Sequence, residues 1–206
     1  MRNPDRPPSA VSPFRVLSRE TLWKGFCTLE RVTFESRRRD GGTRVQTFEI
    51  EHHGWAAAVL AYDPARREAV LVRQLRLPPA LQGDDPMSLE IVAGLLGDLS
   101  EPPEATARRE ALEEAGLALT RLEPIGTLRP SPGLVGEKVW LYLAEVDLGI
   151  ARVADGGGLD HEGEDIEVVV MPLAALAAHV DAGVGLDMKT AYAVQTLRVR
   201  RPDLFG

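Results

Sequence analysis

The chain has 206 residues, with 24 Lys and Arg against 31 Asp and Glu, so its formal net charge is −7. Because this charge repels phosphate backbones and no strong basic patch offsets it, we expect no nucleic-acid partner. The longest apolar stretch, residues 55–62, is far shorter than the about 20 residues that cross a bilayer, so we expect no membrane association. The single cysteine and the absence of a secretory signal favour the cytoplasm over export.

The chain is predicted to form one domain preceded by a short arm. Residues 1–13 are rich in proline and polar side chains, which indicates a disordered or loosely attached segment. The domain over 14–206 is divided into N-terminal strands at 14–53 and a core at 54–206. Two apolar runs in the first part flank Asp40-Gly41-Gly42, and since glycine allows positive φ, this pattern predicts a β-hairpin.

The core is predicted to mix strands with helices. Apolar runs bounded by turn residues predict strands at 55–62, 68–77, 89–94, 138–146 and 166–171. Helices are predicted at 103–115, 172–183 and 187–200. Pro102 and Pro103 precede or open the first helix and Gly116 follows it, as helix ends prefer, and Asp187 is a suitable N-cap for the last. These elements indicate an α/β fold.

Three carboxylates on the first predicted helix suggest a metal site. Glu110, Glu113 and Glu114 stand at i, i+3 and i+4 and therefore share one face. Like charges at this spacing, near the C-terminal end of a helix, are unfavourable for stability. Oxygen ligands without His or Cys select a hard divalent cation such as Mg²⁺ or Mn²⁺. From the spacing alone, a solvated acidic face is the favoured interpretation.

The residues around this helix resemble the box of the Nudix hydrolases. Glu101 is followed, after seven residues, by Arg-Glu-Ala-Leu-Glu-Glu-Ala-Gly-Leu at 109–117, and eight of the nine specified positions of the box match if Ala111 counts as apolar. Gly94 precedes Glu101 by six residues where the box has five, so the loop at 95–100 carries one extra residue. The helical half of the box is intact.

This resemblance implies a Nudix α/β/α sandwich around a mixed sheet, with an N-terminal β-hairpin subdomain that packs across a homodimer. It implies metal-dependent hydrolysis of the pyrophosphate bond in a nucleoside diphosphate sugar. Four stretches outside the box are similar to the ADP-ribose pyrophosphatase and GDP-mannose hydrolase branch: 71–76, 89–94, 131–137 and 162–167.

Two cues within that branch disagree about the substrate. Ser131-Pro132-Gly133 is typical of the ADP-ribose group, whereas Asp187-Met188-Lys189-Thr190 and the triple glycine at 156–158 look closer to the GDP-mannose group. We expect ADP-ribose, cleaved to AMP and ribose 5-phosphate, ahead of GDP-mannose. A non-catalytic sugar-nucleotide sensor on the same fold is the alternative from another class.

The resemblance also implies roles for individual residues. The metal ligands would be Glu110, Glu114, Glu164 and the carbonyl of Ala93. The residues serving catalysis would be Glu162 as general base, Glu113, and the paired Arg109 and Glu101. Arg73, Arg76, Glu137 and Lys189 would bind substrate, since a planar guanidinium can hold a diphosphate in bidentate fashion. For both arginines a surface salt bridge is the competing interpretation, and for 161–167 it is an ordinary acidic loop.

Overall fold

The computed structural model describes residues 14–98, 100–159 and 163–206, so the predicted arm at 1–13 lies outside the described residues. The contacts divide the chain into two compact units. Of the described residues, those up to Gly54 and Ser131–Glu137 form the first unit, and those within Trp55–Pro130 and Lys138–Gly206 form the second. Among the described residues, none of the helices has the length and apolar character needed to cross a membrane.

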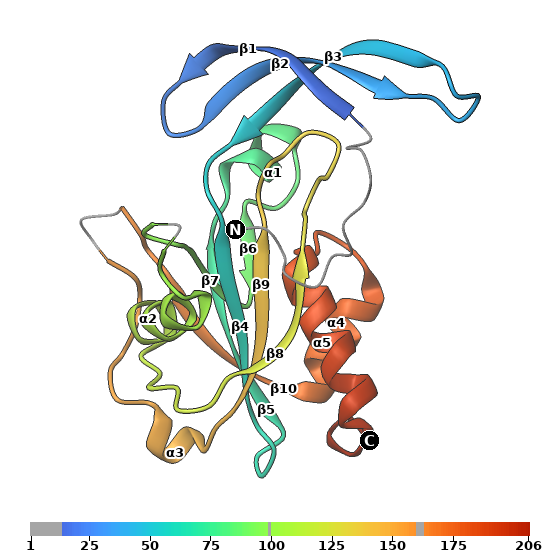
Figure 1. Cartoon of the computed structure of the whole chain (residues 1–206). Coiled ribbons are helices and arrows are strands. Elements are labelled where there is room, and N and C mark those ends of the chain that lie inside the picture. Colours follow the sequence, from blue (N-terminus) through green and yellow to red (C-terminus); the bar gives the residue numbers. More distant parts are fainter. Residues whose placement is uncertain (1–13, 99, 160–162) are drawn as a thin grey trace. The chain divides into compact units, whose positions relative to one another are not determined.

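The first unit is a three-stranded antiparallel sheet in the order β1-β2-β3 (Figure 1). Its strands are β1 (Phe14–Lys24), β2 (Thr28–Arg37) and β3 (Thr43–His52). The predicted hairpin is confirmed as β2 and β3, whose turn contains Gly41 at φ 87°. Residues 131–137 join the end of β3, where Glu51 accepts from the Gly136 amide and donates to the Leu134 carbonyl at 2.8 and 3.0 Å.

The second unit is built on a mixed seven-stranded sheet. Its strands are β4 (Ala56–Asp63), β5 (Glu68–Leu75), β6 (Met87–Glu90), β7 (Val92–Leu95), β8 (Glu123–Leu128), β9 (Val139–Glu145) and β10 (Glu167–Pro172). The order is β10-β5-β4-β9-β8, with β6 beside β5 and β7 beside β4. Strands β4 and β9 run parallel and the other pairs are antiparallel, as the predicted mixed sheet requires.

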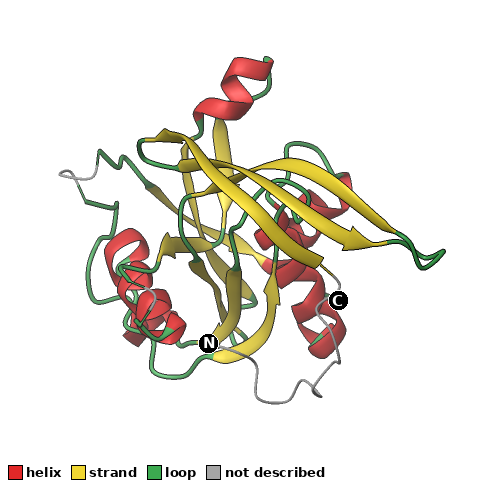
Figure 2. Ribbon diagram, turned by 45° about the horizontal axis from the view of Figure 1, so that its top comes forward, coloured by secondary structure: helices red, strands yellow, loops and turns green. Residues whose placement is uncertain are grey.

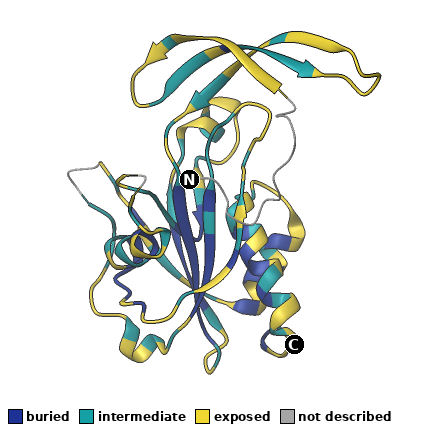
Figure 3. Ribbon diagram, viewed as in Figure 1, coloured by how far each residue is buried: buried dark blue, intermediate teal, exposed yellow. Residues whose placement is uncertain are grey.

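Helices cover both faces of this sheet (Figures 1 and 2). The described helices are α1 (Leu77–Gln82), α2 (Pro103–Ala115), α3 (Leu148–Ala151), α4 (Leu173–Ala182), α5 (Met188–Arg200) and a 3₁₀ turn at Pro202–Leu204. Helix α2 covers one face, and α4 and α5 cover the other. Alternate residues of β4 enter two cores: one contains Leu60 and residues of α4 and α5, and the other contains Val59 and the alanines of α2. Burial on both faces explains why β4 reads as an unbroken apolar run (Figure 3).

The prediction of one continuous strand at 89–94 is wrong. The segment at 89–94 forms two strands, since β6 pairs with β5 whereas β7 pairs with β4. Between them, the Ile91 amide donates to the Thr190 hydroxyl of α5 at 2.9 Å and is therefore lost to the sheet. This switch places Glu90 and Ala93, on either side of the break, next to the residues that form the candidate site.

Candidate active site

Helix α2 has the bounds that its terminal residues predict. Pro103 occupies its first turn, and Gly116 ends it in the left-handed conformation at φ 66°. Small side chains on the inner face pack on the sheet: Ala107, Ala111 and Ala115. Because alanines allow the helix to lie close to the strands, the acidic residues on the neighbouring stripe are drawn inward, and Glu110 and Glu114 are only 8% and 2% exposed.

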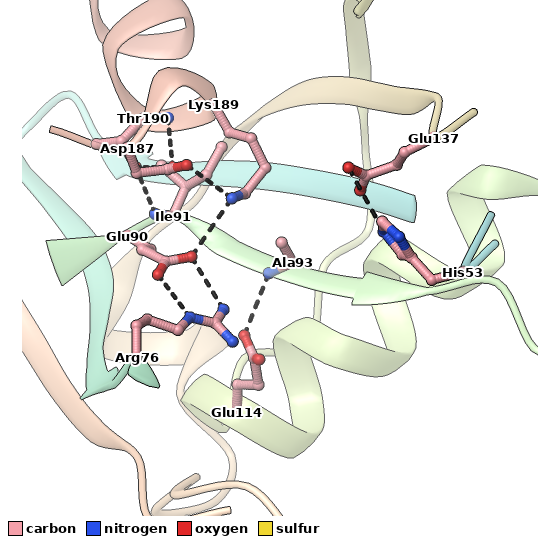
Figure 4. A network of polar contacts seen from close by, with 10 residues as sticks. All are labelled: His53, Arg76, Glu90, Ile91, Ala93, Glu114, Glu137, Asp187, Lys189 and Thr190. Carbon is pink, nitrogen blue, oxygen red and sulfur yellow. Dashed lines mark hydrogen bonds and ion pairs between the residues drawn. The ribbon is translucent and has the colours of Figure 1, made fainter. Parts of the chain in front are cut away.

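Strand β7 receives these two carboxylates. The Ala93 amide donates to Glu114 Oε2 at 3.2 Å, as Figure 4 shows. Gly94 lies against Glu110 so closely that a Cβ at this position would stand 1.9 Å from Glu110 Oε1. The glycine of the box is therefore needed for the approach of a carboxylate, and its φ is not in the left-handed region that only glycine favours.

The nearby positive charge of Arg109 and Arg76 does not offset the burial of these two carboxylates. Burial raises the pKa of Glu114 to about 8, and the charges of Glu110 and Glu164 act in the same direction against the Ala93 hydrogen bond. Burial likewise raises the pKa of Glu110 to about 7, opposed by Arg109 and assisted by Glu113 and Glu164. Three acidic side chains thus interact electrostatically although one of them, Glu164, comes from a distant part of the sequence.

A hard divalent cation fits this donor set. Carboxylate oxygens are the ligands such cations prefer, and a cation would supply the charge that the pKa values of Glu110 and Glu114 show to be missing. Among the described residues, no three acidic, His or Cys side chains already surround one point as ligands would. Glu162, the predicted general base, lies outside the described residues.

Arg109 contacts two glutamates of α2 and the backbone at the end of β7. Its Nη1 donates to Glu113 Oε2 at 2.9 Å and lies 2.8 Å from Glu110 Oε1, while Nη2 donates to the Leu95 carbonyl at 3.2 Å. Its Nε is 4.0 Å from Glu101 Oε1, so the predicted Arg109–Glu101 pair is present only at long range. Glu101 instead accepts from the Gly97 amide at 2.8 Å, within the loop that carries the extra residue.

The triple glycine at 156–158 is attached to the C-terminal end of α2. The amides of Gly157 and Gly158 donate to the carbonyls of Glu114 and Glu113 at 2.9 and 3.1 Å. A Cβ at Gly156 would stand 2.6 Å from the Glu114 carbonyl oxygen, which explains the need for a glycine. Beyond the glycines, Glu164 Oε2 accepts from the Leu159 amide at 2.9 Å. The segment therefore connects Glu164 to the helix that carries the other carboxylates.

Two of the predicted substrate-binding cations meet on a carboxylate that sequence reasoning did not assign to the site (Figure 4). Arg76 donates from Nε and Nη2 to the two oxygens of Glu90 at 2.8 and 3.0 Å, and Lys189 donates to Glu90 Oε2 at 3.3 Å. Burial alone would raise the pKa of Glu90, but these interactions outweigh burial and lower the pKa to about 2. A lone glutamate in an apolar strand was the only signal in the sequence for such a residue.

The remaining two predicted substrate-binding residues have other partners. Arg73 pairs across the sheet with Glu167, Nη1 to Oε2, at 2.9 Å, which is the surface salt bridge of the competing interpretation. Glu137 belongs to the first unit, where its Oε2 is 3.6 Å from His53 Nε2. His53 Nδ1 in turn lies 2.8 Å from Glu51 Oε2.

The raised pKa values predict an unusual pH dependence for the metal-free protein. A carboxyl whose pKa rises from 4.5 to about 7 or about 8 on folding binds more protons in the folded state, so stability falls as pH rises through this window. We expect the thermal midpoint in EDTA to be lower at pH about 8.5 than at about 6, and Mg²⁺ to raise it more at the higher pH. Thermal denaturation followed by circular dichroism measures both effects.

Glu114→Gln is the control for this pH experiment, because it removes one of the two titrating groups while the four histidines remain. Its midpoint in EDTA is expected to depend less on pH than that of the wild type. Identical pH profiles for the two proteins, or a Mg²⁺ effect that does not change with pH, would contradict the assignment of Glu114 to a charge-deficient site.

Comparisons with known proteins agree with this geometry. The NUDIX domain family model matches residues 52–188, more than half of the chain. A GDP-mannose pyrophosphatase of Cronobacter sakazakii is 37% identical over 180 residues, which cover 87% of this chain and 92% of that protein. An ADP-ribose pyrophosphatase of Escherichia coli is 35% identical over 208 residues, covering 99% and 98%.

A solved structure described as an ADP compounds hydrolase has the same fold, with a TM-score of 0.66 and 20% identity over 94% of this chain and 97% of its own. The family model and both relatives span the carboxylate helix and the strand that receives its side chains. The chain belongs to the Nudix family, and it is a hydrolase of pyrophosphate bonds.

Proposed function

We propose that this enzyme hydrolyses the pyrophosphate bond of a nucleoside diphosphate sugar, with ADP-ribose as its preferred substrate and Mg²⁺ as its metal. The observation that carries the proposal is the pair of buried carboxylates, Glu110 and Glu114, against β7, whose pKa values are raised by burial. The products would be AMP and ribose 5-phosphate. We propose a cytoplasmic location, because a chain with a single cysteine cannot form an intramolecular disulfide.

Glu110, Glu114, Glu164 and the Ala93 carbonyl would hold the metal. When bound, the metal neutralises phosphate oxygens and makes water a stronger nucleophile at neutral pH. By resemblance to the ADP-ribose pyrophosphatases, Glu162 would be the general base, with Glu164 as the second candidate. Arg109 holds Glu110 and Glu113 in place and fixes α2 to the end of β7.

The choice between ADP-ribose and GDP-mannose rests on particular residues. The relatives named for the two substrates are of similar identity to this chain. Ser131-Pro132-Gly133 favours ADP-ribose, whereas the Asp187–Lys189 pair, 2.7 Å apart, belongs to the motif that favours GDP-mannose. Comparing kcat/KM for the two compounds decides the question. We expect a higher value for ADP-ribose, and a higher value for GDP-mannose would reverse the assignment.

We also propose a homodimer that forms through the three-stranded sheet. The strand register places apolar side chains on one face, and Phe34 lies at its centre with its ring 6.2 and 5.2 Å from those of Phe14 and Phe48. The opposite face carries ion pairs such as Arg31–Glu49. Phe48 is 46% exposed in the single chain, and an exposed aromatic face of this kind is typical of a protein interface.

Phe48→Glu is expected to weaken the dimer by about 30-fold or more, because it buries a charge in an aromatic contact. Thr47→Glu is the matched control, since Thr47 is the adjacent residue on the polar face of the same strand. Light scattering after size-exclusion chromatography, over a range of concentrations, measures the effect. A wild-type monomer, or equal dissociation of both variants, would refute this interface.

A further inference from the structure

Glu90 is a buried carboxylate with two cationic partners. Its side chain is 5% exposed, whereas those of Arg76 and Lys189 are 42% and 22% exposed. The anion is thus enclosed while both cations reach the surface of the second unit. Because a buried ion pair contributes little to stability compared with apolar packing, this arrangement needs another explanation than the fold alone.

The cations keep donors that are not used within the network. A guanidinium has five N–H donors, and Glu90 accepts from two groups of Arg76, Nε and Nη2. Lys189 has three donors and uses two, one to Glu90 and one to Asp187 at 2.7 Å. In the part of the chain that the structure describes, Nη1 of Arg76 has no hydrogen-bond partner.

Backbone contacts fix the network beside the candidate metal ligands. Asp187 caps α5 by accepting from the Thr190 amide at 2.9 Å, and the Thr190 hydroxyl accepts from the Ile91 amide at 2.9 Å. Ile91 follows Glu90 directly, and two residues further the Ala93 amide binds Glu114. Arg76 and Glu114 are near enough for each to alter the other's pKa. Free donors therefore lie within electrostatic range of the carboxylates (Figure 4).

We propose that Glu90 is a positioning residue, which holds the Arg76 guanidinium and the Lys189 ammonium in the orientation that binds the phosphate oxygens of the substrate. This inference rests on the proposed function, because it concerns the same site. Glu90 does not touch the substrate. It uses both oxygens to fix two flexible cations from different elements, so that less side-chain freedom is lost when the phosphates bind.

Two substitutions separate positioning from charge. Glu90→Gln removes an anion near the bound phosphates, so a purely electrostatic role predicts tighter binding, whereas the positioning role predicts weaker binding. Glu90→Asp keeps the charge and withdraws it by one methylene, so an electrostatic role predicts no change. We expect both variants to raise KM by about 10-fold or more with kcat within about threefold of the wild type.

Asp181→Asn is the matched control, because it also converts a carboxylate to an amide and removes an arginine partner on α5, Arg198 at 2.7 Å. This pair is exposed, and we expect KM and kcat to stay unchanged. Thermal midpoints identify a variant that fails to fold. If Glu90→Gln fails to fold, Glu90→Asp alone decides. An unchanged or lowered KM in folded Glu90→Asp, or a loss confined to kcat, would overturn the positioning role.

A binding measurement keeps this test separate from the proposed function. Calorimetric titration of a methylene-bridged analogue of ADP-ribose in EDTA reports on the cations without turnover or metal. We expect the affinity of both Glu90 variants to fall by about 10-fold relative to the wild type. Wild type that binds the analogue but hydrolyses nothing would defeat the proposed function alone. Equal affinity of wild type and both variants would defeat the role of Glu90 alone.

Discussion

Replacing Glu114 by Gln is expected to lower kcat/KM for pyrophosphate hydrolysis by about 1,000-fold or more. Glu114 is 2% exposed, and burial raises its pKa to about 8 in the absence of a cation, so its negative charge is costly unless a metal accepts it. The amide keeps the size of the side chain and one oxygen but cannot supply the charge. Steady-state kinetics with Mg²⁺ and calorimetric titration of Mn²⁺ measure activity and metal affinity.

Glu104→Gln is the control for this substitution. Glu104 lies on the first turn of the same helix, is exposed, and contributes to the raised pKa of Tyr142. It should retain wild-type kinetics and metal affinity. A Glu114→Gln enzyme that keeps more than about a third of the wild-type rate would show that the carboxylate pair is not the metal site.

Gly94→Ala is expected to lower activity by about 100-fold while the protein remains folded. The added methyl would stand 1.9 Å from Glu110 Oε1, and the atoms that must move belong to the end of a flexible side chain. The backbone of Gly94 is acceptable for alanine, so the change displaces the Glu110 carboxylate and leaves the strand in place. Kinetics and the thermal midpoint of the variant measure the two effects.

A double-mutant cycle with Glu110→Gln tests this explanation. If Gly94→Ala acts by displacing Glu110, the double variant should be no less active than Glu110→Gln alone. Additive losses would mean that the alanine disturbs something other than Glu110. A wild-type rate for Gly94→Ala would mean that the Glu110 carboxylate can move without loss of function.

Local signals were sufficient for much of the fold. Pro103 and Gly116 define α2, and Asp187 caps α5 as predicted, because helix ends are determined by neighbouring residues. Strand β4 was evident since both of its faces are buried. The family and the class of enzyme, predicted from the box, are confirmed by the family model and the relatives.

Two differences from the predicted elements depend on irregular or distant pairing. Strand β1 has register shifts between Val16 and Ser18 and between Thr21 and Trp23, which break the alternation that would reveal a strand. The division between β6 and β7 depends on a hydrogen bond between residues 99 positions apart, Ile91 and Thr190.

The candidate site was predictable where its residues are close in sequence. Glu110, Glu113 and Glu114 share a helix face, which spacing alone reveals. The role of Glu90 depends on partners 14 and 99 positions away, and the interaction of Glu164 with the carboxylate pair depends on how the triple glycine approaches α2. The assigned roles of the site residues stay predictions.

Hydrolysis of ADP-ribose, followed by separation of the nucleotide products, is the decisive assay for metal-dependent cleavage of the pyrophosphate bond. Wild-type enzyme with Mg²⁺ should release AMP and ribose 5-phosphate in equal amounts, EDTA should stop the reaction, and excess Mg²⁺ should restore it. Turnover that persists in EDTA, or no cleavage of ADP-ribose, GDP-mannose or any related nucleotide sugar with either Mg²⁺ or Mn²⁺, would contradict the account of a metal-dependent pyrophosphatase.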